Sequence, residues 1–531
     1  MKRLLVALAC ACLSCTGATG AGLDPPAEPV PEAVKTITAR EIGGHLRFLA
    51  SDLMKGRDTA SPEARVVAEY LAAHLFAAGA EPLGDDEGHG RTFFQSFPLE
   101  VVTPLEAGTE LDLILEFNGS KRVIPCRLGN EFILRPHGIV PGEVEAPVVF
   151  AGFGRVDAEQ EIDDYAGLNV KNQFVLVYDG QSDETKGQQN IQRPVPFFNP
   201  FGKSAAARKN GALGVLMIQA PGRQSPTPRV PFSGANLGFA RPSMTLGPAP
   251  TSLPTLILSD PIRDVLAGAL GLAVDSKPHS ICGGSVRARF RHAARKEFKN
   301  DRNVVGFFPG SDPEKKKDVI IFSAHYDHVG VDDKGEIYNG SDDNASGTSS
   351  LLEIAEAFGL GPKPARSVAF LWVSGEEKGL LGSEWFANHP SLPADARIVA
   401  DINLDMVSRN DPKKIGITPS PRHRQYNTLI PAAQATCKAE GMEAVFDADQ
   451  YYGRTDSYNF SSKGIPVIFF FAGVHADYHR PTDDFDKADL EKAARVARVA
   501  YRLGWQIAQG REVPRTIKSE SSEKAGDVTS K

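Results

Sequence analysis

Four short apolar runs in the second half of the chain constrain its fold more than any other feature of the sequence. They span residues 319–322, 368–373, 398–404 and 467–471, and helix-like segments separate them. Strands that helices bury on both faces have this nearly continuous apolar character. The region from about residue 303 to 508 is therefore predicted to be an α/β unit, with a mixed, mostly parallel central sheet covered by helices.

Acidic residues and histidines follow each of the four apolar runs. In chain order they are His325, Asp327, His328, Glu376, Glu377, Asp405, His475 and His479. In open α/β sheets, ligands bind outside the carboxyl ends of the strands. We therefore expect these side chains to meet in one crevice.

A glycine-flanked turn at residues 340–347 adds the carboxylate of Asp343 to this set. It precedes a predicted helix over residues 347–358, which we expect to end at Gly359. Zinc sites use three or four His and carboxylate ligands per ion, and two-metal hydrolytic sites share a carboxylate between ions about 3.5–4 Å apart. Five ligands with one shared would give three protein ligands to each of two ions.

Each of these motifs also has an ordinary structural explanation. A His–Asp pair on a loop can be a simple hydrogen bond, and two glutamates at a helix start interact favourably with the helix dipole. Asp405 could cap a helix. Only the ordered series of such residues, nearly all at predicted strand ends, favours a functional site.

The motifs SAHYDH (323–328), GSDDNASG (340–347), GEEKGLLGS (375–383), NLDM (403–406) and HADYHRPTD (475–483) closely resemble those of the two-zinc aminopeptidases of metallopeptidase family twenty-eight. The segment LASDLMKGR (49–57) is similar to that family as well. The resemblance implies the zinc-exopeptidase fold. It also implies a dinuclear zinc enzyme that hydrolyses the first peptide bond of peptides with a free amino terminus.

The resemblance also implies roles for individual residues. Asp343 would bridge two zinc ions, His325 and Asp405 would complete the site of one ion, and Glu377 and His479 that of the other. Glu376 would be the general base for a metal-bridged water. Asp327 would orient the ring of His325, as carboxylates next to metal-binding histidines commonly do. The Asp343–Asn344 peptide is expected to be cis, as in the family.

Other residues near these motifs receive weaker assignments. Many relatives have histidine where this chain has Ser457, which draws attention to substrate contacts on that loop. Tyr452 and Asp456 are our candidates for lining the pocket of the first substrate side chain. His328 and His475 are expected to have structural roles or to orient ligands, rather than to bind metal themselves.

The domain organisation follows from changes in composition. We expect a zinc peptidase domain made of residues 32–135 and 296–510, interrupted by an inserted, mainly β domain at residues 136–295. Segments 164–170 and 207–215 of this insertion resemble a protease-associated (PA) domain. The proline-rich stretch 221–254 is predicted to be a surface loop, and the polar residues 511–531 to be a disordered tail.

The first residues have the layout of a secretory signal peptide. Lys2 and Arg3 precede an apolar run at residues 4–13, and small residues follow it. Residues 1–21 are therefore expected to be cleaved from an exported protein, periplasmic or extracellular. Whether one of Cys10, Cys12 and Cys15 carries a lipid anchor, as in a membrane-anchored lipoprotein, stays open. No later apolar run is long enough for a transmembrane span.

Charge and cysteine content exclude other classes. The net charge is −7, without a dense basic patch, so a nucleic-acid partner is not expected. Without the signal peptide, the chain keeps Cys126, Cys282 and Cys437, an odd and sparse set that is not a disulfide framework.

Two rival functions stay open at this level. A carboxypeptidase of the glutamate carboxypeptidase type would use the same site with a cationic pocket, for which Arg454 and Arg480 are candidates. A catalytically inactive, receptor-like binding protein would have the same fold but would lack zinc ligands, whereas all five are present here. Cobalt or manganese would also fit the ligand set.

Overall fold

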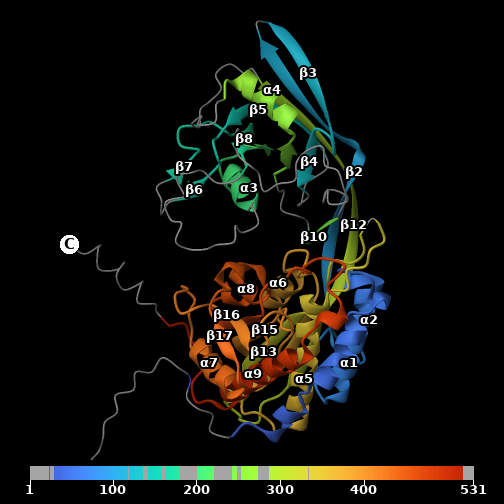
Figure 1. The fold of residues 1–531 in the computed structure, drawn as a ribbon, viewed down its shortest axis with the longest axis vertical. Coiled ribbons are helices and arrows are strands. Elements are labelled where there is room, and N and C mark those ends of the chain that lie inside the picture. Colours follow the sequence, from blue (N-terminus) through green and yellow to red (C-terminus); the bar gives the residue numbers. More distant parts are fainter. Residues whose placement is uncertain are drawn as a thin grey trace, which may run out of the picture.

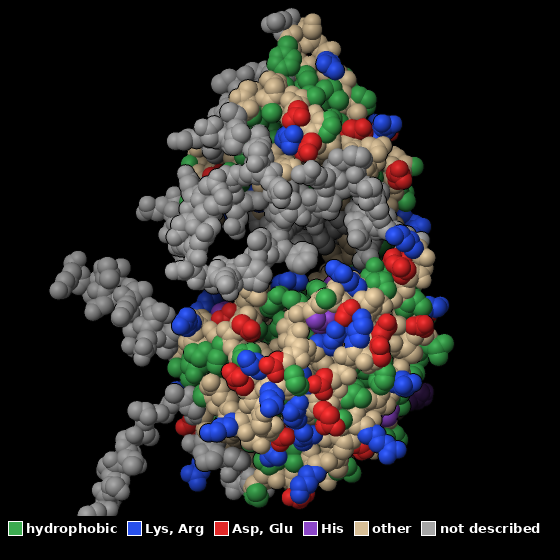
Figure 2. Space-filling view, in the orientation of Figure 1, with side chains coloured by type: hydrophobic (Ala, Val, Ile, Leu, Met, Phe, Trp, Pro, Cys, Tyr) green, Lys and Arg blue, Asp and Glu red, His purple; other side chains and the backbone are tan. Residues whose placement is uncertain are grey.

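The computed structural model describes residues 23, 29–117, 119–135, 142–157, 162–179, 200–219, 242–247, 253–272, 286–332 and 334–517. The predicted signal peptide, the lipid-attachment cysteines and Cys282 lie outside these residues. Figure 1 shows two units, one below the other, joined by long strands. The lower unit contains the predicted peptidase region, and charges of both signs are interspersed over its visible face (Figure 2).

The lower unit is built on a mixed, mostly parallel sheet. Its central strands β14, β13, β15 and β18 are parallel neighbours, in that order. Their bounds are Ser367–Val373, Asp318–His325, Arg397–Leu404 and Val467–Phe471. These strands contain the four apolar runs, which confirms the predicted fold class. β13 continues three residues past the predicted run, so His325 is the last residue of a strand rather than part of a loop.

Further strands extend the sheet on both sides. Antiparallel β16 (Lys414–Thr418) pairs with β18, and β17 (Glu443–Val445) follows it. On the other side β12 (Val286–Phe308) pairs antiparallel with β14, and β1 (Glu81–Pro82) pairs with β12.

Helices cover both faces of this sheet. One face packs against α1 (Ala39–Leu49), α2 (Pro62–Ala77), α5 (Gly347–Leu360), α7 (Leu429–Ala439) and α9 (Leu490–Gln509). The other face packs against α6 (Leu381–Asn388) and α8 (Ser457–Ser461) through Phe386 and Phe460. None of the helices described is both long and apolar enough to cross a membrane.

Two helix ends test the sequence reasoning directly. Thr38 and Glu41, three residues apart, pair at the start of α1: the Thr38 hydroxyl accepts from the Glu41 N–H at 3.3 Å and donates to the Glu41 carboxylate at 2.7 Å. The predicted end of α5 at Gly359 is wrong, since the helix continues to Leu360. A Cβ at Gly359 would lie 2.1 Å from the carbonyl oxygen of Ala78, so this glycine allows close packing of α5 on the end of α2.

Two long antiparallel strands, β2 (Phe94–Phe117) and β12, run from the lower unit into the upper one (Figure 1). The upper unit contains the parallel strands β5, β8, β9 and β11, with β4 antiparallel at the edge. Their bounds are Gly142–Phe150, Phe174–Tyr178, Gly214–Ile218, Thr255–Leu258 and Phe132–Arg135. The unit also contains β3 (Ser120–Arg127) and the helices α3 (Pro200–Lys209) and α4 (Asp260–Leu270).

The core of the upper unit includes residues that the sequence reading placed in the peptidase domain. Leu111, Leu115 and Phe132 pack in one apolar cluster with Phe174 and Phe290. We therefore propose that the second unit begins within β2, before the expected boundary at residue 136, and that β12 returns the chain to the peptidase unit.

Two segments expected to lack structure are partly ordered. The stretch 221–254, predicted to be a loop, contains strand β10 (Ser243–Leu246), which pairs with β2. In the predicted tail 511–531, the backbone of Thr428 donates to Arg515 O at 3.0 Å and Ile517 donates to Tyr426 O at 2.7 Å. The tail therefore stays paired with the fold through residue 517; later residues lie outside those described.

Candidate metal centre

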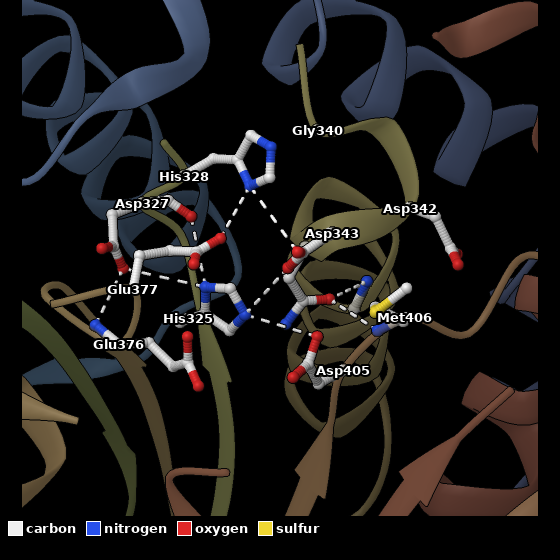
Figure 3. Close-up of polar contacts among 12 residues, drawn as sticks. His325, Asp327, His328, Gly340, Asp342, Asp343, Glu376, Glu377, Asp405 and Met406 are labelled. Carbon is white, nitrogen blue, oxygen red and sulfur yellow. Dashed lines mark hydrogen bonds and ion pairs between the residues drawn. The ribbon is translucent and has the colours of Figure 1, made fainter. Parts of the chain in front are cut away.

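The predicted site residues come together at the carboxyl ends of the parallel strands. His325 ends β13, Glu376 and Glu377 follow β14, and Asp405 follows β15 (Figure 3). Asp343 lies in the turn Ser341–Ser346 that leads into α5. The Asp343–Asn344 peptide is cis, as expected. His479 comes from the loop after β18 and has a positive φ of 52°.

One group of side chains surrounds the first carboxylate oxygen of Asp343. Nε2 of His325 lies 3.4 Å from Oδ1 of Asp343 and 3.3 Å from Oδ1 of Asp405. All three residues are buried. On the other edge of the ring, Nδ1 of His325 lies 3.2 Å from the backbone carbonyl oxygen of Asp327 and 3.7 Å from its carboxylate. The ring is therefore held on one side by Asp327 and directs Nε2 toward two carboxylates.

A second group surrounds the other oxygen of Asp343. Nε2 of His479 lies 3.0 Å from Oδ2 of Asp343 and 3.2 Å from Oε2 of Glu377. The ring of His328 also reaches this group, with Nδ1 2.8 Å from Oε1 of Glu377 and 3.8 Å from Oδ2 of Asp343. Asp343 therefore belongs to both groups, one carboxylate oxygen facing each.

The atoms that face one another in these groups are better arranged to coordinate a metal ion than to form hydrogen bonds with one another. Nε2 of His325 and of His479, Oδ2 of Asp343 and Oδ1 of Asp405 are buried without a hydrogen-bond partner, although they lie within 3.4 Å of each other in pairs. In a tetrahedral zinc site with bonds of about 2.0–2.2 Å, neighbouring ligand atoms are about 3.3 Å apart. The donor types and spacings therefore fit a zinc ion in each group.

Burial and charge shift the ionisation of several groups here. Burial raises the pKa of the Glu376 carboxyl well above its usual range, and nearby carboxylates act in the same direction. Burial alone would lower the pKa of His479, but Glu377 and Asp343 raise it to about 11. The carboxylates of the site thus concentrate negative charge, which attracts positive charge.

The carboxylate of Asp327 holds the backbone of Glu376. The Glu376 N–H donates to Oδ1 of Asp327 at 3.3 Å, and Oδ2 of Asp327 accepts from the Thr59 hydroxyl at 2.8 Å. Glu376 is partly buried, as is Glu377, whereas Asp327 is fully buried. Asp327 therefore holds the Glu376 backbone from the interior of the site.

The two substrate candidates lie in different surroundings. Asp456 is 1% exposed, and burial raises its pKa to about 7 although the charge of His325 opposes that shift. Tyr452 is 6% exposed and packs in an apolar cluster with Phe386 and Phe460, its ring 4.3 Å from that of His423. Both stay candidates for the substrate pocket.

The sequence did not predict the partners of several residues that hold the site together. His328, which was expected to be structural or to orient a ligand, lies 2.8 Å from Glu377 and so belongs with the second group. Asp483 accepts from the backbone N–H groups of Asp342 and Asp343, at 3.0 and 3.2 Å. His475 lies 3.3 Å from Asp342 rather than in either group. Asp483 and His475 lie in the motif HADYHRPTD, but their spacing does not predict these partners.

A helix-covered α/β sheet with two His–carboxylate groups that share one carboxylate at the strand ends is typical of metallohydrolases. Residues 303–504, which contain all five predicted zinc ligands, match the model described as Peptidase family M28. Aminopeptidase YwaD of Bacillus subtilis is 26% identical over 241 residues, which cover 44% of this chain and 51% of that protein. The chain thus spans about half the length of that relative.

Solved structures have the same fold over most of the chain. The aminopeptidase from Aneurinibacillus sp. strain AM-1 is 21% identical with a TM-score of 0.57, covering 92% of this chain and 96% of that one. The zinc aminopeptidase BSAP from Bacillus subtilis is 17% identical with a TM-score of 0.50, covering 90% and 96%. At these identities the likeness concerns the fold alone.

Proposed function

We propose that this protein is a dinuclear zinc aminopeptidase that removes the first residue from peptides with a free amino terminus. The observation that carries the proposal is the placement of Asp343, which turns Oδ1 toward His325 and Oδ2 toward His479, at 3.4 and 3.0 Å. Asp343 would bridge the ions, His325 and Asp405 would complete one site, and Glu377 and His479 the other. The match of residues 303–504 to a peptidase family model and the similarity to named aminopeptidases support the reaction class.

Two zinc ions at such a centre supply polarisation of the scissile carbonyl and a water of lowered pKa. Glu376 would accept a proton from the attacking water and return it to the leaving amine. Asp327 contacts both the backbone of Glu376 and the ring of His325. The proposed general base and the proposed metal ligand are therefore held in fixed positions relative to each other. His328 orients Glu377 from its other oxygen.

The negative charge of the site supports recognition of the amino terminus of the substrate. Glu376, Glu377, Asp405 and Asp456 interact electrostatically within one buried region, and a positively charged α-amino group is attracted to such a region. Arg454 and Arg480, the candidates for a carboxylate pocket, are both exposed. We also propose that the protein is exported, on the signal-peptide pattern of residues 1–21. The inserted unit is proposed to be related to PA domains.

The test is an assay of the zinc-loaded protein with one short peptide in free, N-acetylated and C-amidated forms. Cleavage of the free and amidated forms, but not the acetylated one, is the expected result. Cleavage of only the free and acetylated forms would establish a carboxypeptidase instead. No cleavage of any form or of amino-acid amides, with zinc bound, would favour a binding protein. The Glu376→Gln variant, purified identically, controls for contaminating peptidases.

A further inference from the structure

The segment 49–57 resembles the family, yet none of its residues belongs to the two ligand groups. Its last turn, Asp52–Arg57, contains three consecutive residues with positive φ: Lys55 at 42°, Gly56 at 66° and Arg57 at 48°. A Cβ at Gly56 would lie 2.4 Å from Tyr338 O and 2.6 Å from Gly330 O, so only glycine fits there. This left-handed turn carries the Arg57 side chain into the protein interior.

Arg57 is 1% exposed, and its guanidinium uses all of its N–H groups on backbone carbonyl oxygens. Nε donates to Tyr326 O at 2.9 Å, and Nη1 donates to Leu49 O at 2.8 Å and Asn339 O at 2.6 Å. Nη2 donates to Gly340 O at 3.0 Å and Asp343 O at 3.4 Å. Among the described residues, none of its hydrogen bonds ends on a carboxylate.

The carbonyl groups that Arg57 binds lie beside the ligands. Tyr326 directly follows His325. Asn339 and Gly340 lead into the turn Ser341–Ser346, in which Asp343 presents the shared carboxylate. One side chain therefore ties the end of β13 to the start of α5, the two elements that hold His325 and Asp343 3.4 Å apart. A planar fork with five donors can span both segments at once, which a single ammonium group cannot do.

The charge of Arg57 has a second consequence. Asp343, Asp327, Asp483 and Glu377 all interact favourably with the guanidinium, although none pairs with it directly. A buried arginine without an ion-pair partner is costly unless its surroundings supply compensating negative potential. Here the carboxylates of the site supply it, so Arg57 lowers their mutual repulsion without occupying a ligand atom.

We propose that Arg57 is a positioning residue of the metal centre, which fixes His325 relative to Asp343 so that both groups are arranged for metal binding before a metal arrives. This inference rests on the proposed two-metal function. It differs from a general role in stability because it predicts a specific loss of metal affinity.

The chain offers a matched control in Arg366. This guanidinium is also buried, at 2% exposure, and donates to the carbonyl oxygens of Ile507 and Gly510 at 2.7 and 2.8 Å. It differs in pairing with Asp318, at the start of β13 and thus the opposite end of the strand from His325. Loss of Arg366 should destabilise the fold without changing the geometry of the ligands.

The experiment measures zinc affinity by competition with a chelator, and resistance to denaturant of the metal-free protein, for Arg57→Met, Arg57→Lys and Arg366→Met. We expect Arg57→Met to weaken zinc binding by about 10- to 100-fold, as losses of partners that orient metal ligands usually do. Arg57→Lys keeps the charge but not the fork, and we expect it to weaken zinc binding by about 5-fold or more. Arg366→Met should keep wild-type zinc affinity within about twofold despite lower resistance to denaturant.

Two outcomes would overturn this inference but leave the proposed function intact. One is wild-type zinc affinity in both Arg57 variants, and the other is a loss of affinity in Arg366→Met equal to that in Arg57→Met. If Arg57→Met does not fold, the comparison of Arg57→Lys with wild type and Arg366→Met decides the question. A wild-type chain that binds no zinc would overturn the proposed function together with this inference. The readout is metal binding, so it does not depend on finding the right peptide.

Discussion

The hydroxyl of Thr59 donates a 2.8 Å hydrogen bond to Oδ2 of Asp327, although 268 residues separate them in the chain. Both side chains are buried, at 3% and 0% exposure. A buried carboxylate oxygen that loses its donor costs about 1.5–3 kcal/mol. Thr59→Val, which keeps the shape, is expected to lower the free energy of unfolding by that amount in denaturant titrations.

The control for this prediction is Thr436→Val. The Thr436 hydroxyl is also buried but donates only to the carbonyl of Ala433 in its own helix, at 2.9 Å. Its loss should cost less than about 1 kcal/mol, within the range for neutral hydrogen bonds. Equal losses in the two variants would contradict the importance of the Thr59–Asp327 pair.

Asp343→Ala is expected to lower bound zinc below two ions per chain, because Asp343 belongs to both ligand groups. Elemental analysis of the dialysed protein measures this directly, and circular dichroism checks that the variant is folded. Asp395→Ala, an exposed aspartate on the same unit, is the control and should keep full metal content. Two ions retained in Asp343→Ala would show that Asp343 is not the bridge.

Glu376→Gln is expected to keep its zinc and to lose about two to four orders of magnitude in turnover, the range that general acid–base catalysis supplies. The measurement is steady-state hydrolysis of an amino-acid amide, alongside metal analysis. Glu384→Gln, on the exposed face of α6, should behave as wild type. An active Glu376→Gln variant would remove Glu376 from the role of general base.

The pH dependence of stability should carry a contribution from Asp301. This carboxyl is 4% exposed, and burial raises its pKa to about 6 even though Ala60 N and the Ser374 hydroxyl donate to it. A folded-state pKa above the unfolded value of about 3.9 means that the folded protein binds this proton more tightly. The resulting stability is present below about pH 4 and is lost as the pH rises through about 6.

Asp301→Asn removes this titration. We would measure the free energy of unfolding of both metal-free proteins in denaturant between pH 4 and pH 7. Over this range the value for wild type should fall, relative to that for the variant, by on the order of 2–3 kcal/mol. Parallel pH profiles for the two proteins would contradict the raised pKa.

Gly504 lies in α9 directly over the ring of Phe322, and a Cβ there would be 2.1 Å from the ring. Gly504→Ala is expected to destabilise the fold by about 1–3 kcal/mol through overpacking. Gly44, in α1, has no atom within 4 Å of an added Cβ. Gly44→Ala should instead stabilise the fold by about 0.5–1 kcal/mol, because alanine is the better helix former. Thermal unfolding of both variants measures the contrast.

Local patterns in the sequence were sufficient for the elements of the peptidase unit. Buried strands such as 467–471 are continuous apolar runs, and the pairing of Thr38 with Glu41 depends on residues three apart. Local patterns did not predict the end of α5, because Gly359 is required by a contact with Ala78 at the end of another helix. They did not predict the start of the upper unit either, because it depends on Leu111 packing in the core of that unit.

The sequence by itself determined the chemistry available to this protein: which carboxylates and histidines follow the buried strands, and hence that they meet at one edge of a parallel sheet. Only the tertiary structure decided how each is held. The roles of Arg57, Thr59 and Asp483 arise from hydrogen bonds between segments far apart in the chain. Such contacts leave no periodic signal in a single sequence, because their partners are backbone atoms and loops whose positions exist only once the chain has folded.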